Sequence, residues 1–217
     1  MRCIVTAGPT FEPLDAVRRL TNHSTGTLGS ELANHLVASG HQVTLLLGEA
    51  ATFAGEQRAQ KVLRFTTTDD LADKLTKLAG KSADAVFHAS AVSDFRFGTI
   101  WREGTDGKRT KIKAGKIPTA DGRLFGELIP TPKIISRLRE LFPGSILIGW
   151  KYEIEGSRTD AIRLARQQIL RHQLDHCVAN GPAYGSGFGI VDGTLLTRCT
   201  DKRSLFLRLE KLLRREV

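Results

Sequence analysis

Short apolar runs alternate along the chain with segments in which apolar residues recur every three or four positions. The short runs predict buried strands, and the wider spacing predicts helices that each bury one face. A regular succession of strand and helix is typical of βαβ units, which assemble into a mostly parallel sheet with helices on both faces. The pattern therefore predicts a three-layer α/β fold.

The same pattern places the individual elements. The expected strands are 3–6, 42–47, 84–89, 146–149 and 176–180, and the expected helices are 28–37, 71–78 (capped by Thr68), 132–141, 159–174 and 202–215. Segments 188–191 and 194–198 flank Asp192-Gly193, a pair that predicts a two-residue hairpin near the C-terminus. Residues 96–128 are basic and glycine-rich and are expected as a long loop. No repeat or linker is visible, so one domain over 1–217 is expected.

Loops at one edge of this Rossmann-like sheet carry the candidate chemistry. Open parallel sheets bind their ligands at the carboxyl ends of the strands. The loops after Thr6, Ala89, Ile148 and Val178 all meet at that edge in the expected arrangement. Their convergence predicts a ligand site there.

A phosphate-binding turn is predicted ahead of the first helix. Gly26 and Gly29 open that helix with a spacing at which free amide groups and the helix dipole attract an anion. Asn22 adds a side-chain donor just before the turn, and Gly8 allows close approach from the first strand. The simpler alternative is an ordinary helix start with Ser24 as its N-cap.

Two further segments are candidates for ligand contact. Small residues precede Asp94 at a strand end, so a ligand could lie against the backbone there while the carboxylate accepts hydrogen bonds; alternatively, Asp94 only caps the loop. Lys111 and Lys113 fall on one side of an extended segment and suit the neutralisation of a triphosphate. For them the alternative is a solvated loop.

Charge and composition narrow the function classes. The formal net charge of +9 favours anionic ligands. Aromatic residues make up 6% and do not alternate with the basic ones, which argues against the alternative of a nucleic-acid-binding module. A nicotinamide-dependent reductase is the other alternative, but the first strand lacks a compact Gly-x-Gly-x-x-Gly turn. In addition, neither Tyr152 nor Tyr184 is followed four residues later by a lysine.

Several absences shape the remaining expectations. No apolar run approaches the ~20 residues that span a bilayer, and no leader is visible, so we expect a cytoplasmic protein without a membrane partner. The three scattered cysteines suit reduced thiols. His172 and His176 have a metal-like spacing without a supporting ligand cluster, so we expect no metal held by side chains.

Taken together, the motifs resemble those of phosphopantothenoylcysteine synthetases. The resemblance covers essentially the whole chain in matching order, and its first block is long and specific. The matching residues are Gly8-Pro9-Thr10, Glu12-Pro13-Leu14-Asp15, Val17-Arg18, Asn22-His23-Ser24-Thr25-Gly26-Thr27-Leu28-Gly29, Ala91-Val92-Ser93-Asp94-Phe95, Lys111-Ile112-Lys113, Pro130-Thr131-Pro132-Lys133 and Val178-Ala179-Asn180.

The resemblance implies a ligase that joins phosphopantothenate to cysteine in coenzyme A biosynthesis. In this family the substrate carboxylate attacks the α-phosphate of CTP or ATP, and pyrophosphate leaves. The cysteine amine then displaces the nucleoside monophosphate from the acyl-nucleotide. The resemblance also implies Mg²⁺, a homodimer, and a separate phosphopantothenoylcysteine decarboxylase.

Site residues are implied position by position. For the nucleotide they are Gly8, Ser24, Gly26, Gly29, Asp94, Trp150 and Asn180; for the acyl substrate they are Arg18, Asn22, Ser90, Ala91 and Asp94. Asn22 would stabilise the acyl-nucleotide during amide formation, and Arg18 would reach the neighbouring subunit's substrate. Lys111 and Lys113 would neutralise the triphosphate.

Two segments depart from the bacterial pattern. Ala114 stands where another lysine is usual, and Gly149-Trp150-Lys151-Tyr152-Glu153 replaces Gly-Phe-Ala-Ala-Glu. The second segment is closer to the Phe-Lys-Leu-Glu form of stand-alone and eukaryotic members. We expect CTP as the nucleotide, with ATP as the alternative.

Overall fold

The computed structural model describes residues 1–112, 115–118 and 122–214. Within these ranges an eight-stranded sheet has the order β13-β12-β11-β10-β6-β1-β4-β5. Six strands run parallel, namely β1 (Arg2–Ala7), β4 (Gln42–Gly48), β5 (Lys61–Phe65), β6 (Ala85–His88), β10 (Ile146–Tyr152) and β11 (His176–Asn180). The antiparallel edge consists of β12 (Phe188–Val191) and β13 (Leu196–Cys199). The mostly parallel sheet with a C-terminal hairpin is confirmed.

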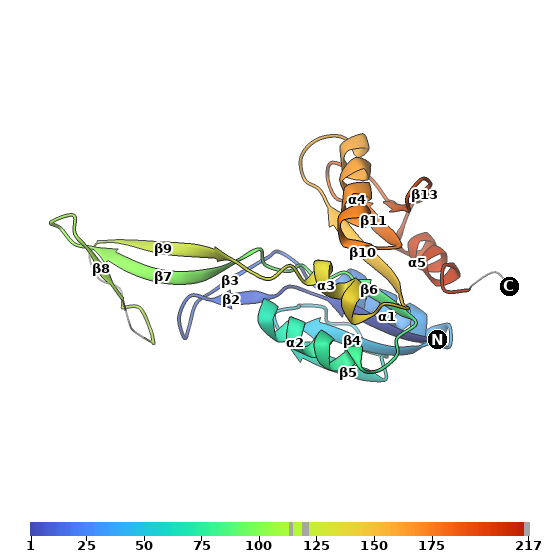
Figure 1. Ribbon diagram of the computed structural model, residues 1–217, viewed down its shortest axis with the longest axis horizontal. Coiled ribbons are helices and arrows are strands. Elements are labelled where there is room, and N and C mark those ends of the chain that lie inside the picture. Colours follow the sequence, from blue (N-terminus) through green and yellow to red (C-terminus); the bar gives the residue numbers. More distant parts are fainter. Residues whose placement is uncertain (113–114, 119–121, 215–217) are drawn as a thin grey trace.

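Helices cover both faces of this sheet (Figure 1). On one face lie α1 (Thr27–Ala38) and α5 (Lys202–Lys211), whose leucines share a core with alternate residues of β1 and β4. On the other lie α2 (Thr68–Ala79), α3 (Ile134–Leu141) and α4 (Arg158–His172), which share a second core. Because strand side chains alternate between faces, the central strands β1, β4, β6, β10 and β11 contribute to both cores. The three-layer architecture is confirmed.

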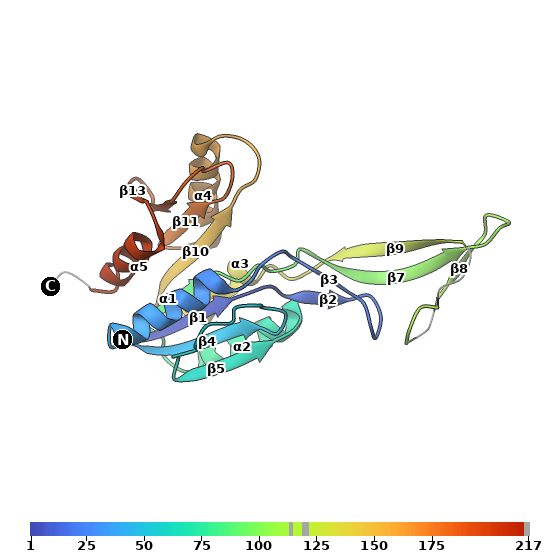
Figure 2. The same ribbon diagram turned by 180° about the vertical axis from the view of Figure 1, so that it is seen from behind.

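An antiparallel arm projects from the sheet, as both views show (Figures 1 and 2). We call "the arm" the three-stranded sheet of β7 (Phe95–Glu103), β8 (Arg109–Lys111) and β9 (Arg123–Pro130), with the order β8-β7-β9. A shorter hairpin, β2 (Phe11–Pro13) and β3 (Arg19–Thr21), extends from the same end of the main sheet.

The expectation of a long loop over 96–128 was therefore wrong. Aromatic and β-branched residues favour paired strands. They face each other here, since Trp101 lies opposite Phe125 in the register of β7 and β9. Intervening glycines and charged residues hide this pattern in the sequence.

Smaller differences concern element ends. Strand β5 was not expected, although Val62, Leu63 and Phe65 carry its signal. The N-cap of α2 is Thr67, whose side chain accepts from the Asp70 amide, and not Thr68. The C-terminal hairpin turns through residues 192–195 instead of two residues, because the Asp192 carboxylate accepts from the two amides before β13.

The three cysteines are free and buried. Burial raises the pKa of the thiols of Cys3 and Cys177 to about 12 and also raises the pKa of Cys199. These groups are therefore protonated thiols inside the core at neutral pH.

Candidate functional site

A glycine-lined hollow forms where β1 meets the start of α1. Gly8 follows β1 with a φ of 80°, and Gly26 is the N-cap of α1 with a φ of 75°. A Cβ on Gly29 would lie 2.6 Å from the Cβ of Ala7, so the first turn of α1 packs directly on the strand end. Gly26 provides no side-chain cap, and the first turn carries no acidic residue. Ser24 is not the N-cap. The arrangement suits an anion at the helix start.

Asn22 and the segment after β6 lie beside this hollow. The Ala91 amide donates to the Gly8 carbonyl at 3.0 Å, and the Asn22 side-chain amide donates to the Val92 carbonyl at 3.1 Å. The Ser90 amide donates to the hydroxyl of Thr6 on β1. Residues far apart in sequence, Gly8, Asn22 and Ser90–Ala91, are thus brought together at the carboxyl edge.

A recess of about 270 Å³ opens at this edge, and we call it the carboxyl-edge recess. It lies on the face of the sheet that α3 and α4 cover. Asp94 lines it, but its carboxylate is paired with Lys133 at 2.5 Å across the opening. The lining residues are His88, Ser90, Val92, Ser93, Asp94, Thr131, Pro132, Lys133, Ile134, Ile135, Trp150, Lys151, Tyr152 and Gln168.

Three buried polar atoms near this edge have no partner among the described residues: Ser90 Oγ, Trp150 Nε1 and Asn180 Oδ1. Buried polar groups are nearly always hydrogen-bonded, so atoms of this kind are candidates for ligand contact. Trp150 packs against the core on the α1 side, and Asn180 shares that face because it lies two residues after Val178. The edge therefore has two halves, one with the glycine hollow and Asn180 and one with the carboxyl-edge recess, and Trp150 takes part in both.

His88 lines the carboxyl-edge recess and was not singled out in the sequence. It is 6% exposed, and its Nδ1 lies 2.9 Å from Thr6 Oγ1. Burial lowers the pKa of the imidazole to about 4, so the ring is neutral at pH 7. A histidine at the end of an otherwise apolar strand was the only signal.

This pKa predicts an acid-sensitive fold. The unfolded histidine titrates near its ordinary value of 6.5, so the unfolded state binds the proton first as the pH falls. As far as His88 is concerned, the free energy of unfolding should fall between about pH 6.5 and pH 4 and then level off. Protonation of His88 alone should account for a loss of about 3 kcal/mol over this range. Urea unfolding of wild type and His88→Gln at several pH values measures the difference. Parallel curves for the two proteins would contradict the prediction.

Arg18 and Lys111 lie away from this edge within the chain. Arg18 follows the tip of the β2–β3 hairpin, where its guanidinium donates to Asp15 and to the Ile117 carbonyl, both at 3.2 Å. Lys111 ends β8, opposite Trp101 on the arm (Figures 1 and 2). Within a single chain, Arg18 and Lys111 therefore do not lie next to the glycine hollow. Lys113 and Ala114 fall outside the described residues.

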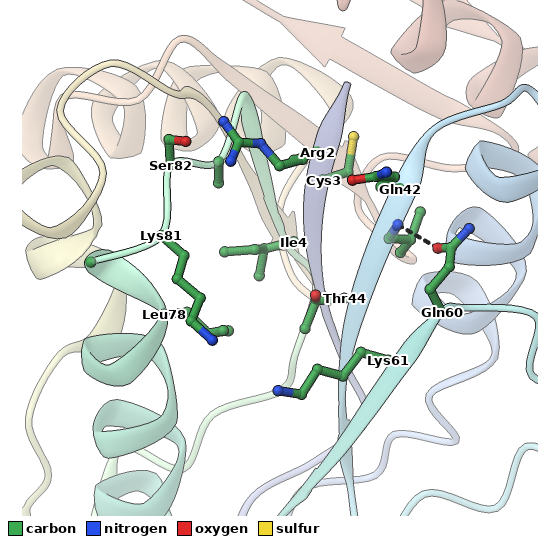
Figure 3. A pocket seen from close by; sticks show the side chains of 13 residues that line it. Arg2, Cys3, Ile4, Gln42, Thr44, Gln60, Lys61, Leu78, Lys81 and Ser82 are labelled. Atoms are coloured by element: carbon green, nitrogen blue, oxygen red, sulfur yellow. Dashed lines mark hydrogen bonds between the residues drawn. The ribbon is translucent and has the colours of Figure 1, made fainter.

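A larger recess, about 670 Å³, lies at the opposite, amino edge of the sheet (Figure 3). Arg2, Lys61 and Lys81 line it, and the side chains of Lys61 and Lys81 reach into it from opposite sides. No side chain that lines it is among the buried unpartnered groups of the described chain. The side chain of Gln60, for example, accepts a hydrogen bond from the Val43 amide. Its polar groups do not indicate a missing ligand, and we place the candidate site at the carboxyl edge.

Among the described residues, neither a group of metal ligands nor a membrane-spanning helix adds a residue to the candidate site. In the described ranges no three His, Cys, Asp or Glu side chains gather as metal ligands. His172 Nδ1 lies 3.1 Å from Ser136 Oγ, and burial lowers the pKa of this half-buried ring. No helix in the part of the chain that the structure describes is long and apolar enough to cross a membrane.

Known proteins are similar to this chain in sequence and in fold. The coenzyme A biosynthesis bifunctional protein CoaBC of Thermococcus kodakarensis is 37% identical over 187 residues, which are 85% of this chain and 42% of that protein. The chain thus spans less than half of that relative. The DNA/pantothenate metabolism flavoprotein from Streptococcus pneumoniae superposes with a TM-score of 0.84 at 27% identity, covering 98% of both chains.

A Cab2 mutant in complex with phosphopantothenate-cysteine shares the fold, with a TM-score of 0.71 and 19% identity over 98% of this chain and 87% of that one. The family model of the DNA/pantothenate metabolism flavoprotein C-terminal domain matches residues 1–211. The match covers the glycine hollow, the carboxyl-edge recess and the arm together. The resemblance seen in the sequence is confirmed, and the chain belongs to the family of this C-terminal domain.

Proposed function

We propose that the chain is a phosphopantothenate–cysteine ligase that acts through an acyl-nucleotide. The observation that carries this proposal is the meeting of the glycine-built helix start with Asn22 and Ser90–Ala91 at one sheet edge. Such a site suits a nucleotide phosphate next to an acyl group. The CoaBC relative and the phosphopantothenate-cysteine complex of Cab2 support the same substrate class.

The reaction has two steps that need different groups. First, the phosphopantothenate carboxylate attacks the α-phosphate, and the departing pyrophosphate must be neutralised. Gly8, Gly26 and Gly29 would supply close backbone contact with the phosphates, while Trp150 and Asn180 would lie at the base. Second, the cysteine amine attacks the acyl carbon, and the nucleoside monophosphate leaves. Asn22 would donate to the acyl-nucleotide in this step.

We propose CTP with Mg²⁺ as the nucleotide substrate. Since no metal-ligand cluster is present in the described chain, the ion would be held mainly by the nucleotide phosphates. The test incubates the protein with phosphopantothenate, cysteine, Mg²⁺ and either CTP or ATP, and follows pyrophosphate and the amide product. Pyrophosphate that depends on phosphopantothenate supports the ligase. Its absence with both nucleotides would overturn the proposal.

We also propose a homodimer in which the arm completes a partner's site. Arg18 and Lys111 lie on the projecting elements, away from the edge that holds Asn22 (Figure 1). Apolar residues of these elements are exposed, among them Val17 at 62% and Leu128 at 50%. An exposed apolar surface of this kind is typical of a protein interface.

Mixing two variants tests the shared site. Lys111→Gln should slow pyrophosphate release, because a cation facing the triphosphate is lost. After subunit exchange with Asn22→Ala, each mixed dimer would contain one intact site, so roughly a quarter of the wild-type activity should return. Lys108→Gln is the matched control, since Lys108 lies on the arm with its side chain 85% exposed. No recovery after verified exchange would place both residues in the site of one chain.

A further inference from the structure

His88 lies between the two strands that flank it in the sheet, β1 and β10. Its Nδ1 faces Thr6 on β1. On its other side is β10, whose residues Trp150 and Lys151 line the carboxyl-edge recess together with His88. Gly149 is the β10 residue in register with His88, and side chains of Leu174 and Gln168 fill the place that a Cβ on it would take.

The hydrogen-bond chain around Thr6 suits an imidazole that carries its proton on Nε2. The Ser90 amide donates to Thr6 Oγ1 at 3.2 Å, and the threonine hydroxyl can in turn donate to His88 Nδ1, which lies 2.9 Å from it. A neutral ring whose Nδ1 accepts carries its hydrogen on Nε2. With this tautomer the ring has a neutral N–H donor in a recess that Ser90 also lines, and Ser90 Oγ has no partner among the described residues.

The two lysines that line the recess are already paired with carboxylates. Lys133 pairs with Asp94, and Lys151 pairs with Glu153 at 2.7 Å. Burial keeps His88 uncharged by lowering its pKa to about 4. A phosphate or carboxylate would find no free cation among these groups, whereas a hydroxyl or amide oxygen would find a donor of matching polarity. The recess thus suits the neutral polar part of a substrate.

We propose that the Nε2–H group of His88, together with Ser90 Oγ, binds a neutral oxygen of the acyl substrate, either its hydroxyl or its amide carbonyl. This inference rests on the proposed ligase function and adds a specificity-determining residue to it. The contact would hold the pantothenoyl chain so that its carboxylate points across the sheet edge toward the nucleotide half of the site. Binding of the nucleotide itself would not involve His88.

Steady-state kinetics separate this role from a structural one. His88→Leu removes the donor at similar volume, and His88→Gln retains an N–H group at a similar position. We expect His88→Leu to raise the KM for phosphopantothenate about tenfold or more, because one hydrogen bond is lost and its buried partner is left unpaired. The KM for the nucleotide should stay within about twofold of the wild-type value. His88→Gln should restore most of the affinity. His172→Leu, a half-buried histidine elsewhere, is the control.

The outcomes distinguish the two proposals. A wild type that releases no pyrophosphate with phosphopantothenate fails as a ligase, whatever His88 does. A working wild type whose His88→Leu and His88→Gln variants behave alike, or lose nucleotide and acyl affinity equally, overturns the role of His88. Long-range ¹H–¹⁵N spectra of wild type test the same point without a variant. The His88 ring should carry its hydrogen on Nε2 and shift with phosphopantothenate, whereas a hydrogen on Nδ1 would contradict the proposal.

Discussion

Replacing Asn22 by alanine should leave first-turnover pyrophosphate release nearly intact and slow amide formation by about 100-fold or more. The glycine hollow that would grip the phosphates does not include the Asn22 side chain. The side-chain amide instead projects from the segment after β3 and donates to the Val92 carbonyl, beside Ser90–Ala91. Without it, the acyl-nucleotide should still form but should lack a donor during attack by cysteine.

Rapid-quench measurement of pyrophosphate and amide in a single turnover checks this order of events. Asn34→Ala is the matched control, because Asn34 also donates its side-chain amide to a carbonyl, that of Glu56, at 2.7 Å on the exposed side of α1. It should leave both steps near the wild-type rate. Equal loss of both products in Asn22→Ala would assign Asn22 to the first step instead.

Replacing Gly29 by alanine should destabilise the protein strongly, because the added methyl group has no space. The new Cβ would lie 2.6 Å from Ala7 Cβ and 3.2 Å from the Thr6 carbonyl, so α1 must move away from β1. Overpacking of this kind costs about 1–3 kcal/mol, and we expect the upper end because the contacts include backbone. The displaced helix start would also weaken nucleotide binding.

Gly80→Ala provides the comparison, since a Cβ there meets nothing within 4 Å and the backbone φ is −71°. It should be neutral or slightly stabilising, because alanine restricts the unfolded chain. Thermal unfolding should place Gly29→Ala roughly 5–10 °C below wild type and Gly80→Ala within a degree or two of it. Similar midpoints for both would show that α1 accommodates the methyl group.

Periodicity predicts the layers of this fold well because the central strands of the sheet are buried on both faces. The apolar run of β1 and the leucine spacing of α1 leave little choice of element type, and parallel order brings Gly8 and Ser90 to one edge. The arm escaped prediction for the opposite reason. Its strands are largely exposed to solvent, where charged residues do not destabilise a strand. Such residues interrupt the alternation of apolar and polar positions around Trp101.

The candidate site was predictable only where backbone geometry constrains the residue type. Gly8 and Gly26 need positive φ, so they stand out in the sequence. The role inferred for His88 depends on Thr6, 82 residues away, and on its neutral state inside the core. Such pairings arise from strand order, which no local pattern contains. The separation of Arg18 and Lys111 from the sheet edge likewise follows from the arm.

The burial of all three thiols has a consequence for the chemistry proposed here. Disulfide exchange and alkylation proceed through the thiolate, and a pKa near 12 leaves almost none of it at neutral pH. An enzyme that handles free cysteine meets cystine in the same solution whenever oxygen is present. Because Cys3, Cys177 and Cys199 are buried, the protein should resist forming mixed disulfides with the cysteine that we propose as its substrate.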